Sequence, residues 1–165
     1  GYGGPVAVLS DAAILAFRET GELSIEPFVE SSLTPNGYDV SVEEVAIPTA
    51  KQTVRAGVAH VPPLTRFAVS TRETVTLGRR LAAQIWLRTT WARRGVLASF
   101  GMIDAGFSGT LTFGAFNASD APLDVPVGDR FAQIVFFELE PPAAATYEKR
   151  SGTYQGQRGV TLPRM

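Results

Sequence analysis

The sequence predicts an all-β fold, built as a sandwich, a jelly roll or a barrel, with one short helix near its start. Its 16 glycines and 11 prolines are spread along 165 residues and are not pooled in a linker. Between them lie short runs in which apolar and polar side chains alternate, the periodicity of strands with one buried face. Helical periodicity is almost absent, and neither a repeat nor a domain boundary is visible. We therefore expect a single domain over residues 1–165.

The one expected helix spans residues 10–20. Ser10 is suited to cap its first turn, where the negative charge of Asp11 is also favourable. Gly21 is placed to end the helix as a C-cap. Three residues would form the apolar face of this helix: Ile14, Leu15 and Phe17.

The rest of the chain is expected to form strands. Seven segments have the required pattern: residues 38–42, 45–47, 66–71, 74–77, 81–87, 110–116 and 130–139. Residues 143–165 follow without a periodic core pattern. They are expected to form an extended tail that is either disordered or closed over a site.

Composition excludes several classes of protein. A net charge of −1 and a pI near 5.9 argue against a dedicated duplex-DNA binder. The absence of Cys removes disulfide scaffolds and thiolate chemistry, and a single His argues against His-based metal sites and a Ser–His–Asp triad. No apolar run is long enough to span a bilayer. We expect a soluble cytoplasmic enzyme or small-ligand binder.

The first five residues, Gly1-Tyr2-Gly3-Gly4-Pro5, lack the basic start and long apolar run of a signal peptide. They also lack an initiator Met, which indicates a trimmed or engineered N-terminus.

Arginines are concentrated after the strand expected at residues 81–87. Thirteen of the 15 basic residues are Arg, whose planar guanidinium can grip phosphate oxygens in two places. Composition alone favours a solvated surface. However, Arg88-Thr89-Thr90 leaves a strand, and Arg93-Arg94-Gly95 follows one short turn later. Hydroxyls, turn N–H groups and guanidinium groups would converge there, which is a common way to build an anion site.

A second candidate region surrounds Asp104. Gly101, Gly106 and Gly109 flank this carboxylate and Phe107, which indicates a hairpin whose backbone approaches another group closely. Asp104 is either a turn former or a carboxylate that activates water beside a phosphate site, and spacing alone leaves both open.

The remaining aromatic and titratable candidates carry less chemistry. His60 is expected at the surface or in a loop, and Trp86 and Trp91 in the core or in subunit contacts. Neither a P-loop nor a Rossmann turn is present.

Together these motifs resemble the dUTPase and dCTP deaminase superfamily along nearly the whole chain. The N-terminal half of its deaminase-like branch is similar to three segments: Leu9-Ser10-Asp11, Ile25-Glu26-Pro27-Phe28 and Pro35-Asn36-Gly37-Tyr38-Asp39-Val40. Four further segments match motifs of the superfamily. The phosphate motif is matched by Arg88-Thr89-Thr90-Trp91-Ala92-Arg93, and the nucleoside-binding hairpin by Ile103-Asp104-Ala105-Gly106-Phe107-Ser108-Gly109. The Gly-x-Arg-x-Ala-Gln motif is matched by Gly128-Asp129-Arg130-Phe131-Ala132-Gln133-Ile134, and the C-terminal lid by Tyr154-Gln155-Gly156-Gln157-Arg158-Gly159. Thr replaces both Ser residues of the phosphate motif.

One position separates the branches of this superfamily. The deaminases carry a Glu on the strand after the hairpin, where it transfers protons as water replaces the cytosine amino group. The matching residue here is Gly114, and Asp120 and Asp124 lie beyond the strand. Its neighbours on the same face, Thr110, Thr112 and Phe116, are not acids either. The resemblance is therefore closest to the archaeal-type dUTPases. The alternatives are a dCTP deaminase, a bifunctional dCTP deaminase/dUTPase, or a non-catalytic nucleotide-binding relative.

The resemblance implies a dUTP diphosphatase in which Asp104 activates water for attack on the α-phosphate. It implies three further groups of site residues: Arg88, Thr89, Thr90, Arg93 and Gln133 for the phosphates; Gly101, Ile103, Phe107 and Gly109 for the base and deoxyribose; and Tyr147, Gln157 and Arg158 in a lid formed by the tail.

The resemblance also implies a cofactor and an assembly. Mg²⁺ would be held by phosphate oxygens and waters, with Asp39 either supporting that water shell or only the fold. The implied fold is a distorted jelly roll of the dUTPase type, assembled as a homotrimer with active sites at subunit boundaries. Trp91 would suit a buried subunit contact in that trimer. Neither nucleic acid nor a membrane is expected as a partner.

Overall fold

The computed structural model describes residues 7–163, so the expectation for residues 1–5 lies outside the described residues. These described residues contain three α-helices: α1 (Asp11–Thr20), α2 (Thr89–Arg93) and α3 (Tyr147–Arg150). The strands are β1 (Leu23–Glu26), β2 (Leu33–Thr34), β3 (Gly37–Ile47), β4 (Gln52–Val54), β5 (Val58–Val61), β6 (Thr65–Thr71), β7 (Thr74–Leu77), β8 (Leu81–Leu87), β9 (Val96–Ser99), β10 (Met102–Ile103), β11 (Ser108–Gly109), β12 (Thr112–Asn117), β13 (Leu123–Pro126) and β14 (Arg130–Glu138). Two 3-10 turns, Glu30–Ser32 and Pro48–Ala50, flank β2 and β4.

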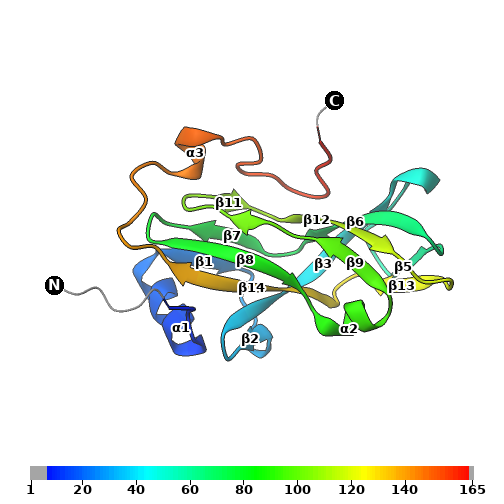
Figure 1. The fold of residues 1–165 in the computed structure, drawn as a ribbon, viewed down its shortest axis with the longest axis horizontal. Helices are drawn as coiled ribbons and strands as arrows, with labels where there is room; N and C mark the ends of the chain where they lie inside the picture. The colour runs from blue at the N-terminus through cyan, green and yellow to red at the C-terminus, as the bar shows by residue number, and fades with distance from the viewer. Residues whose placement is uncertain (1–6, 164–165) are drawn as a thin grey trace.

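The strands form one large antiparallel sheet and two small ones (Figure 1). The large sheet has the order β10-β8-β14-β3-β6-β12-β9, with β2 and β4 also paired to β3. The small sheets are β1-β7-β11 and β13-β5. The fold is therefore mostly β and jelly-roll-like, which confirms the predicted fold class.

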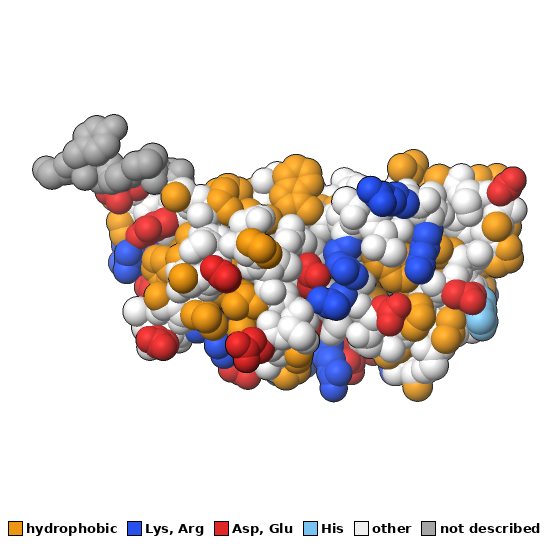
Figure 2. Space-filling model, turned by 90° about the horizontal axis from the view of Figure 1, so that it is seen from below, with side chains coloured by type: hydrophobic (Ala, Val, Ile, Leu, Met, Phe, Trp, Pro, Cys, Tyr) orange, Lys and Arg blue, Asp and Glu red, His pale blue; other side chains and the backbone are white. Residues whose placement is uncertain are grey.

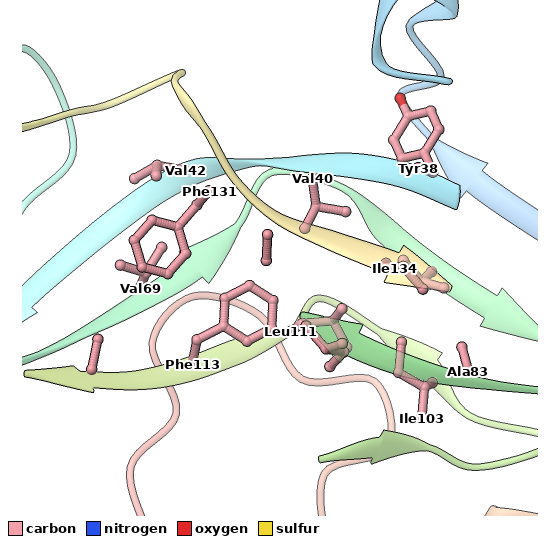
Figure 3. Packing of buried hydrophobic residues seen from close by; sticks show 14 of the residues in the cluster. Tyr38, Val40, Val42, Val69, Ala83, Ile103, Leu111, Phe113, Phe131 and Ile134 are labelled. Carbon is pink, nitrogen blue, oxygen red and sulfur yellow. The ribbon is translucent and has the colours of Figure 1, made fainter. Parts of the chain in front are cut away.

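The core lies between strands that the curled sheet brings to face one another. Figure 3 shows Phe131 of β14 and Phe113 of β12 pointing toward each other across the interior. Their rings are stacked with centroids 6.2 Å apart, and both are buried. Phe67 packs edge-on against Phe131 from β6. Burial of these aromatic and branched side chains supplies the main driving force for closing the sheet.

Helix α1 forms as predicted. The Ser10 side chain accepts a hydrogen bond from the Ala13 N–H, and Gly21 ends the helix with φ of 81°. Ile14 is fully buried, but Leu15 is 39% exposed, so placing Leu15 on the apolar face was wrong. Adjacent helical residues point about 100° apart, so Leu15 turns away from the side on which Ile14 packs.

The predicted strands are found, with changed limits. The segments at residues 74–77 and 81–87 coincide with β7 and β8. Those at 38–42 and 45–47 are one strand, β3, whose pairing with β6 shifts between Val42 and Glu44. Eight short strands of two to four residues were not predicted: β1, β2, β4, β5, β9, β10, β11 and β13.

The tail is ordered against the molecule as far as it is described. It begins with the single turn of α3 and then runs along β11 and β12, above the sheet in Figure 1. The described residues contain no helix that is both long and apolar enough to cross a membrane.

Three single-residue expectations also have outcomes. Trp91 is 2% exposed and packs on Phe131 of its own chain, so of the two expectations for it the core position is confirmed, and almost no surface of this side chain is left for a subunit contact. Its indole N–H donates to the Arg130 carbonyl at 2.9 Å. Trp86, in contrast, is 52% exposed and so is not a core residue. His60 is exposed as expected but lies on β5, where its Nδ1 is 2.6 Å from Asp124 Oδ1.

Candidate functional site

The hairpin around Asp104 connects β10 to β11 and is anchored by its backbone. The Gly106 N–H donates to the carbonyls of Leu77 and Gly78, at 3.0 and 3.2 Å. Gly106 has φ of +87°, and a Cβ there would lie 2.4 Å from the Cβ of Thr146. Because both the conformation and the close approach require glycine, this residue lets the tail lie directly on the hairpin.

A cavity of about 250 Å³, which we call the nucleoside cavity, lies against this hairpin. Six of the residues proposed from the sequence line it: Gly101, Ile103, Asp104, Phe107, Tyr147 and Gln157. Gly109 and Arg158 are not among the lining residues. The Phe107 ring is buried and meets Tyr147 edge-on, with centroids 5.4 Å apart. Asp104 is exposed and is the sole acidic residue among those lining the cavity.

The tail completes the wall of this cavity. Gln155 accepts from the Ser108 N–H at 3.1 Å and donates to the Gly106 carbonyl at 3.0 Å. The carbonyl of Gln157 accepts from the Thr110 N–H at 3.0 Å. Sequence reasoning placed the lid here but did not single out Tyr154, which lines the cavity beside Gln157.

A larger hollow of about 760 Å³, the side groove, adjoins the nucleoside cavity. The two share four lining residues: Ser99, Thr112, Tyr154 and Gln157. Gly114 lies on the floor of the side groove, where an added Cβ would meet nothing within 4 Å. Among the described residues, Arg66 is the one charged residue that lines it. The position at which the deaminases are expected to carry Glu is therefore open space.

The arginine-threonine motif lines a separate cavity of about 210 Å³, the phosphate cavity. Four residues proposed for the phosphates lie there: Arg88, Thr89, Thr90 and Gln133. Arg93 is exposed in the last turn of α2 and does not line it. Figure 2 shows basic side chains gathered on the face of the molecule that carries α2.

A buried carboxylate organises the phosphate cavity. Asp39 on β3 is 3.1 Å from Arg88 Nε and 3.7 Å from Arg130 Nη1, with a side chain only 7% exposed. Burial raises the pKa of Asp39, and the two guanidinium groups partly oppose that shift. These contacts direct Asp39 toward the arginines, so the structure assigns it to holding Arg88.

Thr34 is a member of the phosphate cavity that sequence reasoning missed. Its hydroxyl accepts from Gln133 Nε2 at 2.8 Å, although 99 residues separate the two. The short pairing of β2 with β3 places Thr34 there, and a two-residue strand leaves no pattern in the sequence. The phosphate cavity shares no lining residue with the other two hollows.

Acidic residues do not gather into a metal site in the part of the chain that the structure describes. Residues 7–163 contain no group of three or more His, Cys, Asp or Glu side chains placed to hold a metal ion. Asp120 and Asp124, the other acids considered from the sequence, line none of these three hollows.

Comparison with known proteins gives concordant matches. A family described as dCTP deaminase-like matches residues 46–139. The dCTP deaminase of Thermococcus gammatolerans is 39% identical over 86% of this chain and 89% of its own length. That of Pyrococcus horikoshii is 39% identical over 82% and 86%, respectively.

Solved structures show the same fold at lower identity. The 2′-deoxycytidine 5′-triphosphate deaminase of Agrobacterium tumefaciens has a TM-score of 0.69 at 19% identity over 81% of this chain, which spans about half (48%) of that chain. The dUTPase of EIAV has a TM-score of 0.51 at 16% identity, over 78% of this chain and 98% of that one.

Proposed function

The chain belongs to the dCTP deaminase-like family, and from this premise we propose that it is a dUTP diphosphatase. More broadly, the chain is an enzyme of the dUTPase and dCTP deaminase superfamily. One observation favours dUTP hydrolysis within that group: Asp104 is the sole acidic residue lining the nucleoside cavity and the side groove, and position 114 has no side chain. Such a site has a carboxylate for activating water but none at position 114 to carry protons to a pyrimidine ring.

In the proposed reaction, the nucleoside lies in the nucleoside cavity and the base is read by the hairpin backbone. Peptide N–H and C=O groups can complement the edge of uracil without side chains. We also propose that the ring of Phe107, which lines this cavity, leaves no room for a 2′-hydroxyl on the sugar. Asp104 orients a water molecule and accepts its proton as the oxygen attacks the α-phosphorus. The bond from that phosphorus to the bridging oxygen breaks, which gives dUMP and pyrophosphate.

The triphosphate would be bound by the phosphate cavity. Arg88 offers a guanidinium, Thr89 and Thr90 offer hydroxyls, and Gln133 offers an amide. Arg93, exposed on α2, is placed to reach a phosphate only outside this cavity. Mg²⁺ would enter with the nucleotide as its triphosphate complex and neutralise charge there, which fits the lack of an acidic cluster among residues 7–163.

This mechanism requires a second copy of the chain. Asp104 and the phosphate motif line different cavities, yet water activated by Asp104 must reach a phosphorus that the arginines hold. A neighbouring copy can supply the phosphate motif if it docks over the side groove beside the nucleoside cavity. Leu97, which lines the side groove, is 63% exposed and would be buried in such a contact. We propose that these copies form a homotrimer with sites between subunits.

A nucleotide panel tests the proposal. The protein is incubated with dUTP, dCTP, dTTP and UTP in the presence of Mg²⁺, and pyrophosphate and ammonia are followed separately. We expect pyrophosphate from dUTP and no ammonia from dCTP. Absence of pyrophosphate from dUTP would sink the proposal, and tight binding of dUTP without any product would indicate a nucleotide-binding relative.

A second candidate, dCTP deamination, is favoured by the names of the relatives. It requires a proton carrier near the base, which position 114 lacks. Ammonia from dCTP in the same panel would establish it, and ammonia together with pyrophosphate would establish a bifunctional enzyme.

A further inference from the structure

From Thr146 onward, the tail is held almost entirely by the hairpin that it covers. Among residues 146–163, the hydrogen bonds to the rest of the chain go to residues 105–112, with one exception. Tyr147 N–H donates to the Ala105 carbonyl at 2.7 Å, and Gln157 Nε2 donates to the Thr110 carbonyl at 2.7 Å. Thr161 N–H donates to the Thr112 hydroxyl at 3.2 Å. These bonds hold the tail to the hairpin and to the first residue of β12, at one side of the large sheet.

The exception is Glu44 of β3. Its Oε2 accepts a hydrogen bond from the Val160 N–H at 3.0 Å, and its Oε1 accepts one from Arg55 Nε at 2.8 Å. The carboxylate is only 16% exposed. Gly159 has φ of +63°, a conformation that favours glycine. A Cβ at this position would lie 2.8 Å from Glu44 Oε2, so the close approach of the tail backbone to this carboxylate also requires glycine.

The position of Glu44 makes this contact a clamp between tail and sheet. Glu44 pairs with Ser70 on β6, which in turn pairs with Thr112 on β12. The tail therefore crosses from the hairpin edge to a strand two places further into the sheet. Val160 comes three residues after Gln157, which lines the nucleoside cavity and the side groove. Fixing Val160 thus limits how far Gln157 can move from the cavity.

We propose that Glu44, held in place by Arg55, is a positioning residue that clamps the C-terminal lid over the nucleoside cavity. The kinetic part of this inference depends on the proposed dUTP hydrolysis, whereas the clamp itself does not. Burial alone would raise the pKa of Glu44, but the hydrogen bonds from Val160 and Arg55 lower it overall. The acceptor is therefore charged at neutral pH, and a charge-assisted bond of this kind is stronger than a neutral one.

Amide exchange tests the clamp without any activity. We expect Glu44→Ala to lower the exchange protection of the Val160 amide about tenfold, the size of one charge-assisted hydrogen bond at a partly exposed position. Trypsin should also cleave faster after Arg158, an exposed residue of the tail. Glu43→Ala is the matched control, because Glu43 is exposed on the same strand and its side chain makes no hydrogen bond or ion pair with residues 7–163.

Steady-state kinetics distinguish a positioning role of Glu44 from a purely structural one. With dUTP, we expect Glu44→Ala to raise KM about tenfold and to change kcat by less than about twofold, because bound nucleotide restores the docked tail. Glu44→Gln keeps an acceptor for Val160 and should recover part of the loss. Unchanged Val160 protection in Glu44→Ala would overturn the clamp, and so would a loss of protection spread over the whole sheet. If dUTP proves not to be a substrate, the exchange and proteolysis results still decide the question.

Discussion

The two halves of the candidate site are built by opposite means. The nucleoside cavity is lined by a glycine-rich hairpin and by a tail that is hydrogen-bonded mainly through backbone and two glutamines. The phosphate cavity consists of side chains on paired strands and on a short helix, fixed by the buried contact of Asp39 with Arg88 and Arg130.

The nucleoside cavity can therefore adapt to its ligand, whereas the phosphate cavity is preorganised before the ligand binds. A hairpin covered by a tail can open to admit a nucleoside and then close and exclude water. A guanidinium held by a buried carboxylate already points in one direction before ligand arrives, so less conformational entropy is lost on binding. Activity should therefore depend on the tail at the nucleoside cavity, and ligand binding should depend on charged side chains at the phosphate cavity.

The largest effect should come from the carboxylate of the nucleoside cavity. Asp104→Asn keeps the size of the side chain but removes the base, so we expect kcat for dUTP to fall about a thousandfold. Affinity for the non-hydrolysable α,β-imido analogue of dUTP should change little, as measured by titration calorimetry. Asp120→Asn serves as the control, because Asp120 is exposed and lines none of the three hollows. Comparable turnover in the Asp104 variant and the parent would refute the role of Asp104.

Shortening the tail should have the next largest effect. A chain that stops before Ser151 loses the segment that carries Tyr154 and Gln157, and we expect kcat/KM to fall about a hundredfold through misplacement and water entry. The melting temperature should change little, since the tail contributes no strand to the sheets. A chain that stops before Leu162 retains the bonds of Val160 and Thr161 and is the matched control. Full activity of the shorter chain would show that the tail is not a lid.

The smallest effect should come from the phosphate cavity. Asp39→Ala releases Arg88, and we expect the α,β-imido analogue of dUTP to bind about tenfold more weakly, a loss of about 1.4 kcal/mol. Deoxyuridine should bind as before, because it does not reach this cavity. Glu138→Ala is a suitable control, because it breaks the exposed ion pair with Arg80 outside both cavities. Equal weakening for nucleoside and triphosphate would remove the distinction between the two halves.

Predictions from sequence were most reliable where a pattern repeats within one segment. Helix α1 was found from Ser10 and Gly21, because caps are local signals. Strands β7 and β8 were found from alternation over their whole length. The exposure of Leu15, the burial of Trp91 and the location of Thr34 depend on what packs against each residue, which the sequence does not display.

The sequence by itself determined the family, the all-β class and many of the residues that line the two candidate cavities, because these follow from short motifs and local periodicity. The tertiary structure decided how those motifs meet. It paired Asp39 with Arg88, laid the tail on the hairpin and anchored it at Glu44, and it separated Asp104 from the phosphate motif within one chain. The physical reason is that each of these contacts joins residues far apart in sequence, brought together by strand register and burial and not by any local preference.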